Sequence, residues 1–179
     1  MSAAYCLAAP AHPLHGPYHD SEYGFPAADE SVLFERLVLE INQAGLSWLT
    51  VLRKREAFRA AFAQFDVDRI AAFNEEDVAR LLGDAGIVRN RLKIGAIIAN
   101  AARIQELRAS HGSFHAWLEA HHPRSLEEWT RLFRQTFRFT GGLIVHEFLM
   151  SLGYLPGAHE PDCPVYARIL PLAPPWSRP

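Results

Sequence analysis

The chain has 179 residues, of which 49% are hydrophobic and 21% are charged, and its formal net charge at pH 7 is −2. These values are ordinary for a soluble globular protein, so they exclude a disordered or fibrous chain and argue against a uniformly basic nucleic-acid coat. No uninterrupted apolar segment reaches the ~18 residues of a membrane span, and no basic region followed by an apolar run opens the chain. We therefore expect one domain, residues 1–179, in the cytoplasm and without a membrane partner.

The two ends of the chain are rich in residues that interrupt regular structure. Residues 1–28 contain many Pro, Gly, Ala and His residues and no periodic apolar run, which predicts an extended arm rather than a helix. Residues 164–179 contain five prolines and are predicted to wrap the surface without regular structure, as the last part of a tail at 154–179.

Residues 29–153 are predicted to form a helical body, because apolar residues recur at helical spacing between polar N-cap residues and glycines. No stretch alternates apolar and polar residues with the period of a strand, so the predicted fold class is all-α. The predicted N-caps are Asp29, Ser47, Asp66, Asn74, Ser113 and Ser125, the last in a capping box with Glu128. The predicted helices are 29–44, 47–65, a short turn after Asp66, 74–83, a long helix after Asn90, two helices separated by Pro123, and 143–152.

The helix predicted at 29–44 carries an acidic residue, Glu40, within its apolar stripe. Because an unpaired ionised carboxylate is costly in such a stripe, Glu40 is either ion-paired within an ordinary helix-turn-helix corner or functional. Gly45 is predicted to end this helix and Ser47 to cap the next one. This arrangement brings Leu46 and Trp48 to a tight exposed corner beside Glu40.

Basic residues gather at 53–55, at 89–93 and at 131–138, although the net charge is slightly negative. Any one of these groups is most simply a solvated helix face. For the three groups together this interpretation is less favoured.

The segment 83–90 joins two predicted helices through a short glycine-containing connection, which predicts a hairpin near residues 75–107. Free amide N–H groups at the start of the second helix can bind a phosphate, and Arg89, Arg91 and Lys93 lie nearby. A helix-hairpin-helix that grips a DNA backbone has this layout. An ordinary pair of antiparallel helices also needs a glycine here, so the pattern alone leaves both interpretations open.

Four Cys and His residues near the two termini have the spacing of metal ligands. His159 and Cys163 are four residues apart, and Cys6 and His19 are thirteen apart. Together they can form a Cys₂His₂ zinc site that ties the arm to the tail and leaves no open position for a catalytic water. The competing ligands by spacing are His12, His15 and Asp162.

These motifs resemble those of a known family, the bacterial 3-methyladenine DNA glycosylase I enzymes, which are helical helix-hairpin-helix proteins of base-excision repair. The resemblance covers nearly the whole chain, and the run Gln-Ala-Gly-Leu-Ser-Trp at 43–48 is its specific signature. The other segments that carry it are Tyr18-His19-Asp20, Glu22-Tyr23-Gly24, Leu39-Glu40, 50–56, Asp84-Ala85-Gly86-Ile87, Lys93-Ile94, Phe137-Arg138-Phe139, His159 and Cys163.

The resemblance implies a role for each motif. It implies a glycosylase fold whose terminal segments are tied by a structural zinc, and a base pocket built around Glu40 as the catalytic residue. The implied zinc ligands are Cys6, His19, His159 and Cys163, the aromatic residues around the base are Tyr18, Tyr23 and Trp48, and the DNA-binding residues are Leu46 near the gap in the duplex and Gly86, Arg89 and Arg91 at the hairpin.

The implied activity is monofunctional hydrolysis of the N-glycosidic bond of 3-methyladenine in double-stranded alkylated DNA, by a monomer at the bacterial nucleoid. Methylation at N3 makes adenine cationic, so a buried carboxylate and aromatic faces attract the base. The same charge makes the base a good leaving group. An enzyme for this lesion can therefore rely on extrusion and recognition of the base, with little acid catalysis.

Four positions depart from the family pattern. Ala8 stands where the family commonly has a tryptophan, His15 where it has a tyrosine, Tyr23 where it has a tryptophan, and Ile41 where a glycine follows the pocket glutamate. These departures support an alternative, a divergent member that binds DNA or a nucleobase without this activity, its pocket opened by Ala8 and narrowed by Ile41.

Overall fold

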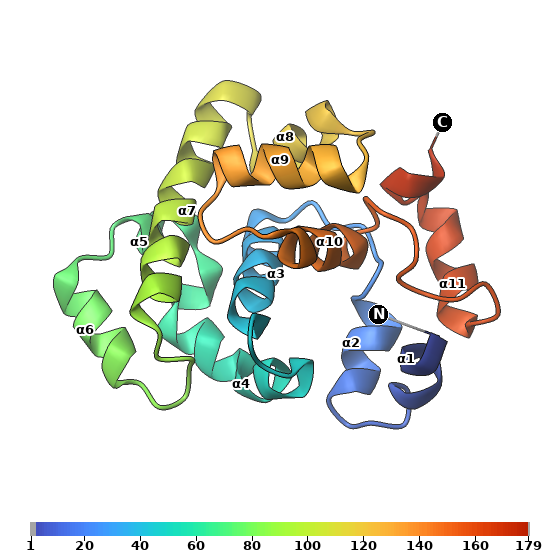
Figure 1. Cartoon of the computed structure of the whole chain (residues 1–179), viewed down its shortest axis with the longest axis horizontal. Helices are drawn as coiled ribbons and strands as arrows, with labels where there is room; N and C mark the ends of the chain where they lie inside the picture. Colours follow the sequence, from blue (N-terminus) through green and yellow to red (C-terminus); the bar gives the residue numbers. More distant parts are fainter. Residues whose placement is uncertain (1–2, 179) are drawn as a thin grey trace.

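The computed structural model describes residues 3–178, and the regular structure in this part of the chain is helical (Figure 1). The all-α prediction is confirmed. The helices are α1 (Ala3–Ala8), α2 (His15–Ser21), α3 (Glu30–Gln43), α4 (Trp48–Ala61), α5 (Val67–Ala71), α6 (Glu75–Gly83), α7 (Arg91–His111), α8 (Phe114–His121), α9 (Leu126–Thr136), α10 (Gly142–Ser151) and α11 (Pro164–Ile169), with the short 3₁₀ segments η1 (Ala63–Phe65), η2 (Leu170–Leu172) and η3 (Pro175–Ser177).

The predicted N-caps start the helices of the body. The Asp29 carboxylate accepts hydrogen bonds from the amides of Ser31 and Val32 at 2.9 and 3.1 Å. Ser125 and Glu128 form the predicted capping box at the start of α9. These side chains satisfy amides that have no partner within the helix, which is why the helix starts were predictable.

Two predictions about the ends of the chain were wrong. The arm contains α1 and α2 instead of an extended segment, and the tail contains α11, η2 and η3. Pro164 occupies the first turn of α11, where its fixed φ and missing amide hydrogen fit a helix. Helices of six or seven residues are marginal alone, so packing rather than local sequence accounts for them.

The helix predicted at 47–65 is also shorter than expected. It ends at Ala61, and Ala63, Gln64 and Phe65 follow with φ between 50° and 59°, a left-handed turn that non-glycine residues rarely adopt. The turn places the rings of Phe62 and Phe65 in the core, where both are essentially fully buried. This burial of aromatic surface offsets the cost of the backbone conformation.

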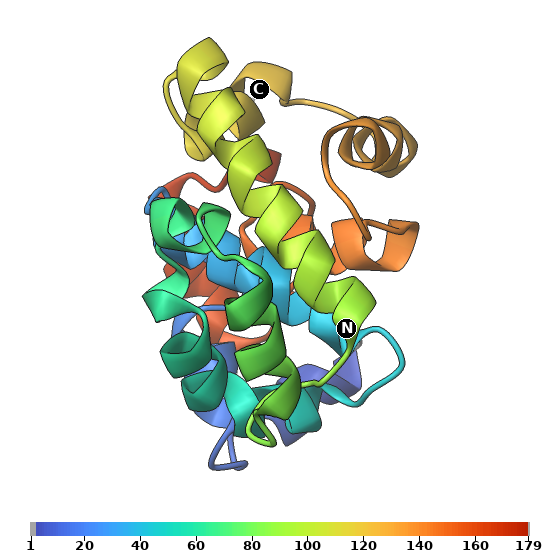
Figure 2. The same cartoon turned by 90° about the vertical axis from the view of Figure 1, so that its left-hand side faces the viewer.

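Helix α3 lies in the middle of the fold and holds the core together. Residues 33–42 are all buried, and α3 packs against α4, α7, α8 and α10. Helix α7 crosses the molecule, with α5 and α6 packed beside it (Figure 2). No helix within residues 3–178 has the length and apolar character needed to cross a membrane.

The arm and the tail lie together at one end of the molecule, where α1, α2 and α11 are neighbours in Figure 1. Two arginines connect this end to the body. Arg36 donates to the carbonyl oxygens of Glu22 and Ser151 at 2.8 and 2.6 Å, and Arg55 pairs with Glu22 and Glu35, each at 2.6 Å. The arm is therefore fixed relative to α3, α4 and α10.

Candidate functional site

The corner after α3 has the predicted form except at Trp48, which was expected to be exposed and is buried at 8% exposure. The helix ends at Gln43, Gly45 takes a φ of 85° that favours glycine, and Ser47 caps α4 by accepting from the amide of Thr50 at 3.2 Å. Leu46 is 41% exposed at the tip of this corner. The corner therefore presents backbone and one apolar side chain to solvent immediately beside Glu40.

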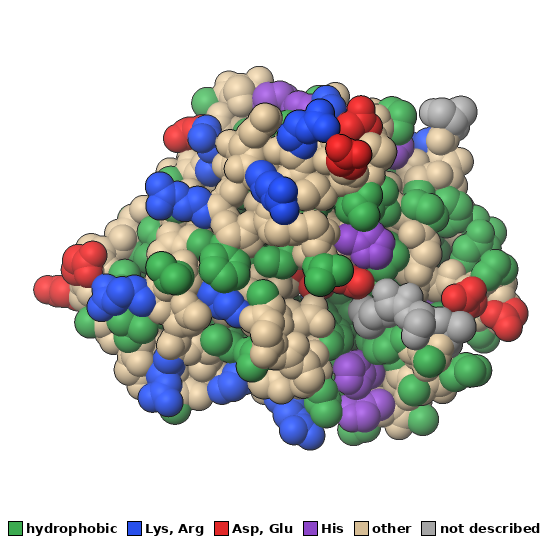
Figure 3. All heavy atoms as spheres, viewed as in Figure 1, with side chains coloured by type: hydrophobic (Ala, Val, Ile, Leu, Met, Phe, Trp, Pro, Cys, Tyr) green, Lys and Arg blue, Asp and Glu red, His purple; other side chains and the backbone are tan. Residues whose placement is uncertain are grey.

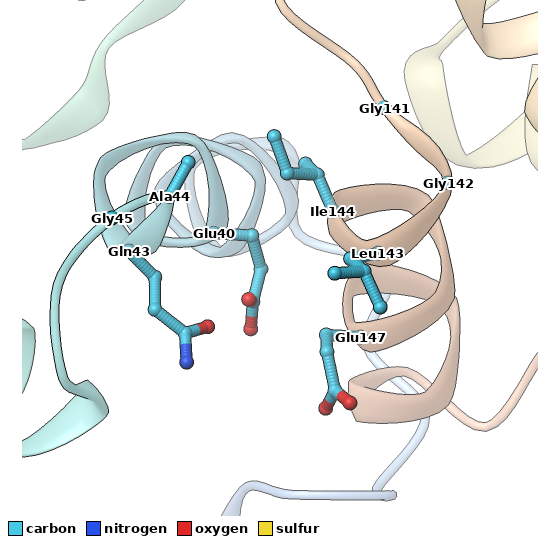
Figure 4. Close-up of a pocket in the computed structure, with 9 residues that line it drawn as sticks. All are labelled: Glu40, Gln43, Ala44, Gly45, Gly141, Gly142, Leu143, Ile144 and Glu147. Atoms are coloured by element: carbon cyan, nitrogen blue, oxygen red, sulfur yellow. The ribbon is translucent and has the colours of Figure 1, made fainter.

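A cavity of about 560 Å³ lies between the C-terminal end of α3 and the N-terminal part of α10. Glu40, Gln43 and Glu147 point in the same direction into it from the two helices (Figure 4). The residues that line the cavity are Glu40, Gln43, Ala44, Gly45, Gly141, Gly142, Leu143, Ile144 and Glu147.

Glu40 is buried at the inner side of this cavity and is only 3% exposed. Within residues 3–178, its Oε2 has no hydrogen-bond partner and its carboxylate has no ion pair. Burial raises the pKa of Glu40 well above its ordinary value, the negative charge of Glu147 raises it further, and the Arg36 guanidinium lowers it. This environment disfavours the interpretation of Glu40 as half of a structural salt bridge.

The three aromatic residues predicted around the base form a cluster near Glu40. The ring centroid of Tyr18 lies 5.1 Å from that of Trp48 and 5.7 Å from that of Tyr23, and all three rings are buried. The lining of the cavity includes Glu40 and none of these three side chains. Their role as walls around a base stays a prediction.

Two residues near the cavity were missed in the sequence. Tyr5 packs edge-on against Tyr23 at 6.0 Å and bonds through its hydroxyl to the His15 ring at 3.2 Å, a contact hidden by the prediction of an extended arm. Glu147 lines the cavity from α10. The sequence carried the same signal for Glu147 as for Glu40, because Glu147 is a carboxylate that lies three residues after Ile144 in an apolar helix.

Two of the departures from the family pattern, at Ile41 and Ala8, lie away from the lining of the cavity. Ile41 is fully buried in the core. Successive side chains on a helix are rotated by about 100°, so Ile41 points into the core when Glu40 points into the cavity. Ala8 is exposed at the end of α1. Neither residue lines the cavity, so the expectation that Ile41 narrows it was wrong, whereas the opening expected at Ala8 from the missing tryptophan side chain stays a prediction.

Cys6, His19, His159 and Cys163 come together at the end of the molecule formed by α1, α2 and α11. Their four ligand atoms lie within 4.8 Å of one another, and Cys163 Sγ lies 3.8 Å from His19 Nε2 and 3.6 Å from His159 Nδ1. In a tetrahedral zinc site the ligand atoms are about 3.3–3.8 Å apart, so this cluster needs little adjustment to hold the ion.

The other ring nitrogen of each histidine has a partner that orients the ring. His19 Nδ1 lies 2.7 Å from the Asp20 carboxylate, and His159 Nε2 lies 2.7 Å from the carbonyl oxygen of Tyr23. Such outer hydrogen bonds are typical of metal-binding histidines. The donor set and its surroundings fit a structural zinc.

The connection between α6 and α7 is a compact hairpin. The Asp84 carboxylate accepts from the Gly86 amide at 2.7 Å, and the Lys54 ammonium donates to the carbonyl oxygens of Ala85 and Gly86 at 2.9 and 3.1 Å. A Cβ on Gly86 would come within 2.9 Å of Ala57, so α4 approaches the hairpin too closely for any other residue.

The structure corrects the predicted phosphate site in two respects. The Asn90 side chain caps α7 and already accepts from the amides of Leu92 and Lys93, so these amides are not free. Lys93 is 4% exposed and donates to the carbonyl oxygens of Asn42 and Ala44, at 3.0 and 2.7 Å. It therefore supports the corner after α3 instead of facing solvent.

The basic group at 53–55 is also not a surface patch. Lys54 and Arg55 are committed to the contacts described above, and only Arg53 is exposed. Arg89 and Arg91 are exposed at the hairpin, as predicted, and Arg91 lies 3.8 Å from Glu75. On the face shown in Figure 3, lysine and arginine side chains lie over the α4, α6 and α7 region and over α9.

Comparison with known families decides the relationship. The family model described as methyladenine glycosylase matches residues 8–131, which include Glu40 and the hairpin. The chain belongs to the methyladenine glycosylase family. The matched residues end before α10, so Glu147 lies outside them.

Individual relatives agree with this assignment. The chain is 39% identical to DNA-3-methyladenine glycosylase 1 of Escherichia coli, over 86% of this chain and 92% of that protein, and 36% identical to DNA-3-methyladenine glycosylase of Haemophilus influenzae, over 82% and 89%. A solved variant of 3-methyladenine DNA glycosylase I in complex with 3-methyladenine has a TM-score of 0.80 and 31% identity, and the match covers 87% of this chain and 93% of that one. These comparisons confirm the family, the fold class and the DNA glycosylase enzyme class predicted from the sequence.

Proposed function

We propose that this chain hydrolyses the bond between 3-methyladenine and deoxyribose in double-stranded DNA. The observation that carries the proposal is the buried Glu40 carboxylate, which faces a cavity of about 560 Å³ without a partner among the described residues. Pockets for small molecules typically measure about 300–1,000 Å³, so an extruded purine is accommodated. The relatives that bear this activity in their names support the choice of substrate.

The chemistry follows from the charge of the lesion. A base methylated at N3 is cationic, and a cation beside Glu40 favours the ionised form of a carboxyl group whose pKa burial otherwise raises. When the glycosidic bond breaks, its electron pair goes to the base, water adds to C1′ and its proton passes to solvent. Glu40 selects the charged base and stabilises positive charge near the reacting bond.

The Cys6, His19, His159 and Cys163 cluster supports a structural role for zinc. Four protein ligands complete the coordination of the ion and leave no position for a reacting water. The ion would cross-link the arm and the tail. Because Tyr23 bonds to His159 through its carbonyl oxygen, this cross-link also supports the aromatic cluster beside Glu40.

The hairpin between α6 and α7 supports a helix-hairpin-helix contact with the DNA backbone. We assign this contact to Gly86 and to the exposed Arg89 and Arg91, and we assign the exposed Leu46 to the gap that the extruded base leaves. One chain carries the pocket, the corner and the hairpin, so a monomer at the bacterial nucleoid is sufficient for the reaction.

Release of free base from methylated DNA tests this function directly. Duplex DNA treated with dimethyl sulfate is incubated with the purified protein, and the bases released are separated by chromatography. We expect 3-methyladenine to appear in proportion to enzyme. Binding of the DNA without any released base would instead support the divergent member, an alternative that loses support because Ile41 is buried in the core and does not line the cavity.

A further inference from the structure

The cavity contains two carboxylates that come from different helices. Glu40 projects from α3 and Glu147 from α10, and both point into the same space (Figure 4). They differ in exposure: Glu40 is 3% exposed and has an unpartnered oxygen among the described residues, whereas the Glu147 side chain is 22% exposed. A ligand in the cavity therefore meets a deep carboxylate and a second one nearer to solvent.

The position of Glu147 is fixed by buried groups. The Tyr23 hydroxyl donates to its Oε2 at 3.2 Å, and His146 Nδ1 lies 3.6 Å from its Oε1. Tyr23 is itself fully buried and is anchored by the bond from His159 to its carbonyl oxygen. The Glu147 carboxylate is thus held at the side of the cavity.

We propose that Glu147 is a second specificity-determining residue, which together with Glu40 makes the cavity selective for purines that carry a positive charge. The inference rests on the proposed function and adds a residue to its site. Two carboxylates that share a cavity repel each other, and a cation placed between them removes this repulsion and is attracted by both. A neutral base gains neither effect, so each carboxylate adds to the discrimination.

The charge of the base changes during the reaction, and this change determines which step the two carboxylates affect. The substrate base is cationic, but the electron pair of the broken bond leaves the released 3-methyladenine neutral. The pair attracts the substrate and loses this attraction to the product. We therefore expect Glu147 to act mainly on the binding of the charged base, and only slightly on the rate of the chemical step.

Two small probes separate charge from shape. The 3,9-dimethyladeninium ion is a permanent cation with a methyl group in place of the sugar, and 3-methyladenine at pH 8 is its neutral counterpart. Calorimetry gives the dissociation constant of each probe for the wild type, Glu147→Gln and the control Glu76→Gln. The control removes the same charge from an exposed position on α6.

Glu147→Gln is expected to weaken binding of the cation about tenfold, equal to about 1.4 kcal/mol, and binding of the neutral base less than about threefold. Glu76→Gln should change neither constant. Glu147→Asp keeps the charge and should retain most of the preference, which separates a role of charge from a structural role of the side chain. If Glu147→Gln unfolds, the comparison of Glu147→Asp with Glu147→Ser at equal melting temperature replaces it.

An equal loss for both probes, or no loss for the cation, would overturn the inference, as would a wild type that binds both probes equally or neither. Base release from methylated DNA by the wild type is measured in parallel. Absence of release refutes the proposed function, whereas normal release with unchanged charge preference in Glu147→Gln refutes only the role of Glu147.

Discussion

A buried carboxylate without a hydrogen-bond or ion-pair partner lowers the stability of a folded protein, and Glu40 has this character within the described residues. Such a carboxylate is expected where a ligand binds to it. Arg36 is also buried nearby, but its hydrogen bonds go to the carbonyl oxygens of Glu22 and Ser151. The guanidinium reduces the cost of a negative charge at Glu40 without forming an ion pair. The site is thereby left able to accept a cation.

This environment predicts how the stability of the protein depends on pH. The folded-state pKa of Glu40 lies well above the unfolded value of 4.5, so between these two values the folded chain binds one more proton than the unfolded chain. The free energy of unfolding therefore falls as pH rises through this window, by up to about 1.4 kcal/mol per unit. Among the described residues, the titratable neighbours of Glu40 are Tyr5, Tyr18 and Tyr23, whose pKa values burial raises, and the charges of Glu147 and Arg36 shift the position of the window.

Thermal unfolding of the wild type and Glu40→Gln between pH 5 and pH 8 measures this contribution. The amide cannot ionise, so the melting temperature of Glu40→Gln relative to the wild type should rise with pH. A difference that stays constant across the range would mean that the folded-state pKa of Glu40 is not raised. A variant much less stable at every pH would indicate a structural ion pair.

At the scale of single residues, the sequence pointed to Glu40 as a candidate and missed Glu147. Both lie in apolar helices, but Glu40 is next to a glycine corner whereas Glu147 lies within the apolar run of α10. The prediction for Lys93 was also wrong, because it placed at the surface a side chain that is buried. A lysine beside two arginines suggests a surface, and only the fold reveals that its ammonium donates to the last carbonyls of α3.

The elements of the body were predictable because their ends are encoded locally. Side chains such as Asp29, Asn74 and Ser125 cap helices within three residues of themselves. Helices α1, α2 and α11 were not predictable, since contacts distant in sequence stabilise them. Tyr18 in α2, for example, is buried against Trp48.

The hairpin between α6 and α7 is the element that we expect to hold the DNA backbone. Arg89→Glu should weaken binding to any duplex and lower the slope of log K against log salt by about 1, because phosphate contacts release counterions regardless of sequence. Titrations of a labelled duplex at several salt concentrations measure the slope. Arg124→Glu, an equal charge change at an exposed site between α8 and α9, is the control.

An Arg89→Glu slope equal to that of the wild type would show that the exposed arginine is only a solvated side chain. A decrease of the same size in Arg124→Glu would also contradict the assignment. It would mean that the effect comes from the net charge of the protein instead of a contact at the hairpin.

At the scale of the whole molecule, the proposed zinc site joins the two ends of the chain and supports the arm that carries Tyr18 and Tyr23. Metal analysis should find about one zinc per chain, and Cys163→Ser should lose it. If the lost site contributes about 2 kcal/mol or more, the melting temperature should fall by at least about 4–8 °C.

The matched control for this change is Asp162→Asn, which alters the exposed neighbour of Cys163 and a competing ligand by spacing. It should keep the metal and the melting temperature. A wild type without zinc, or a Cys163→Ser variant that retains the metal, would contradict the ligand set.

The pocket, the corner and the hairpin lie on one chain, and the function proposed for them requires that Glu40 recognises a positively charged base. The most direct measurement is the single-turnover rate of 3-methyladenine release from methylated duplex DNA by the wild type and Glu40→Gln at pH 7. We predict a rate about 10–100-fold lower for Glu40→Gln, equal to about 1.4–2.8 kcal/mol, at an undiminished melting temperature. An unchanged rate together with a loss of stability would contradict the account and make Glu40 a structural residue.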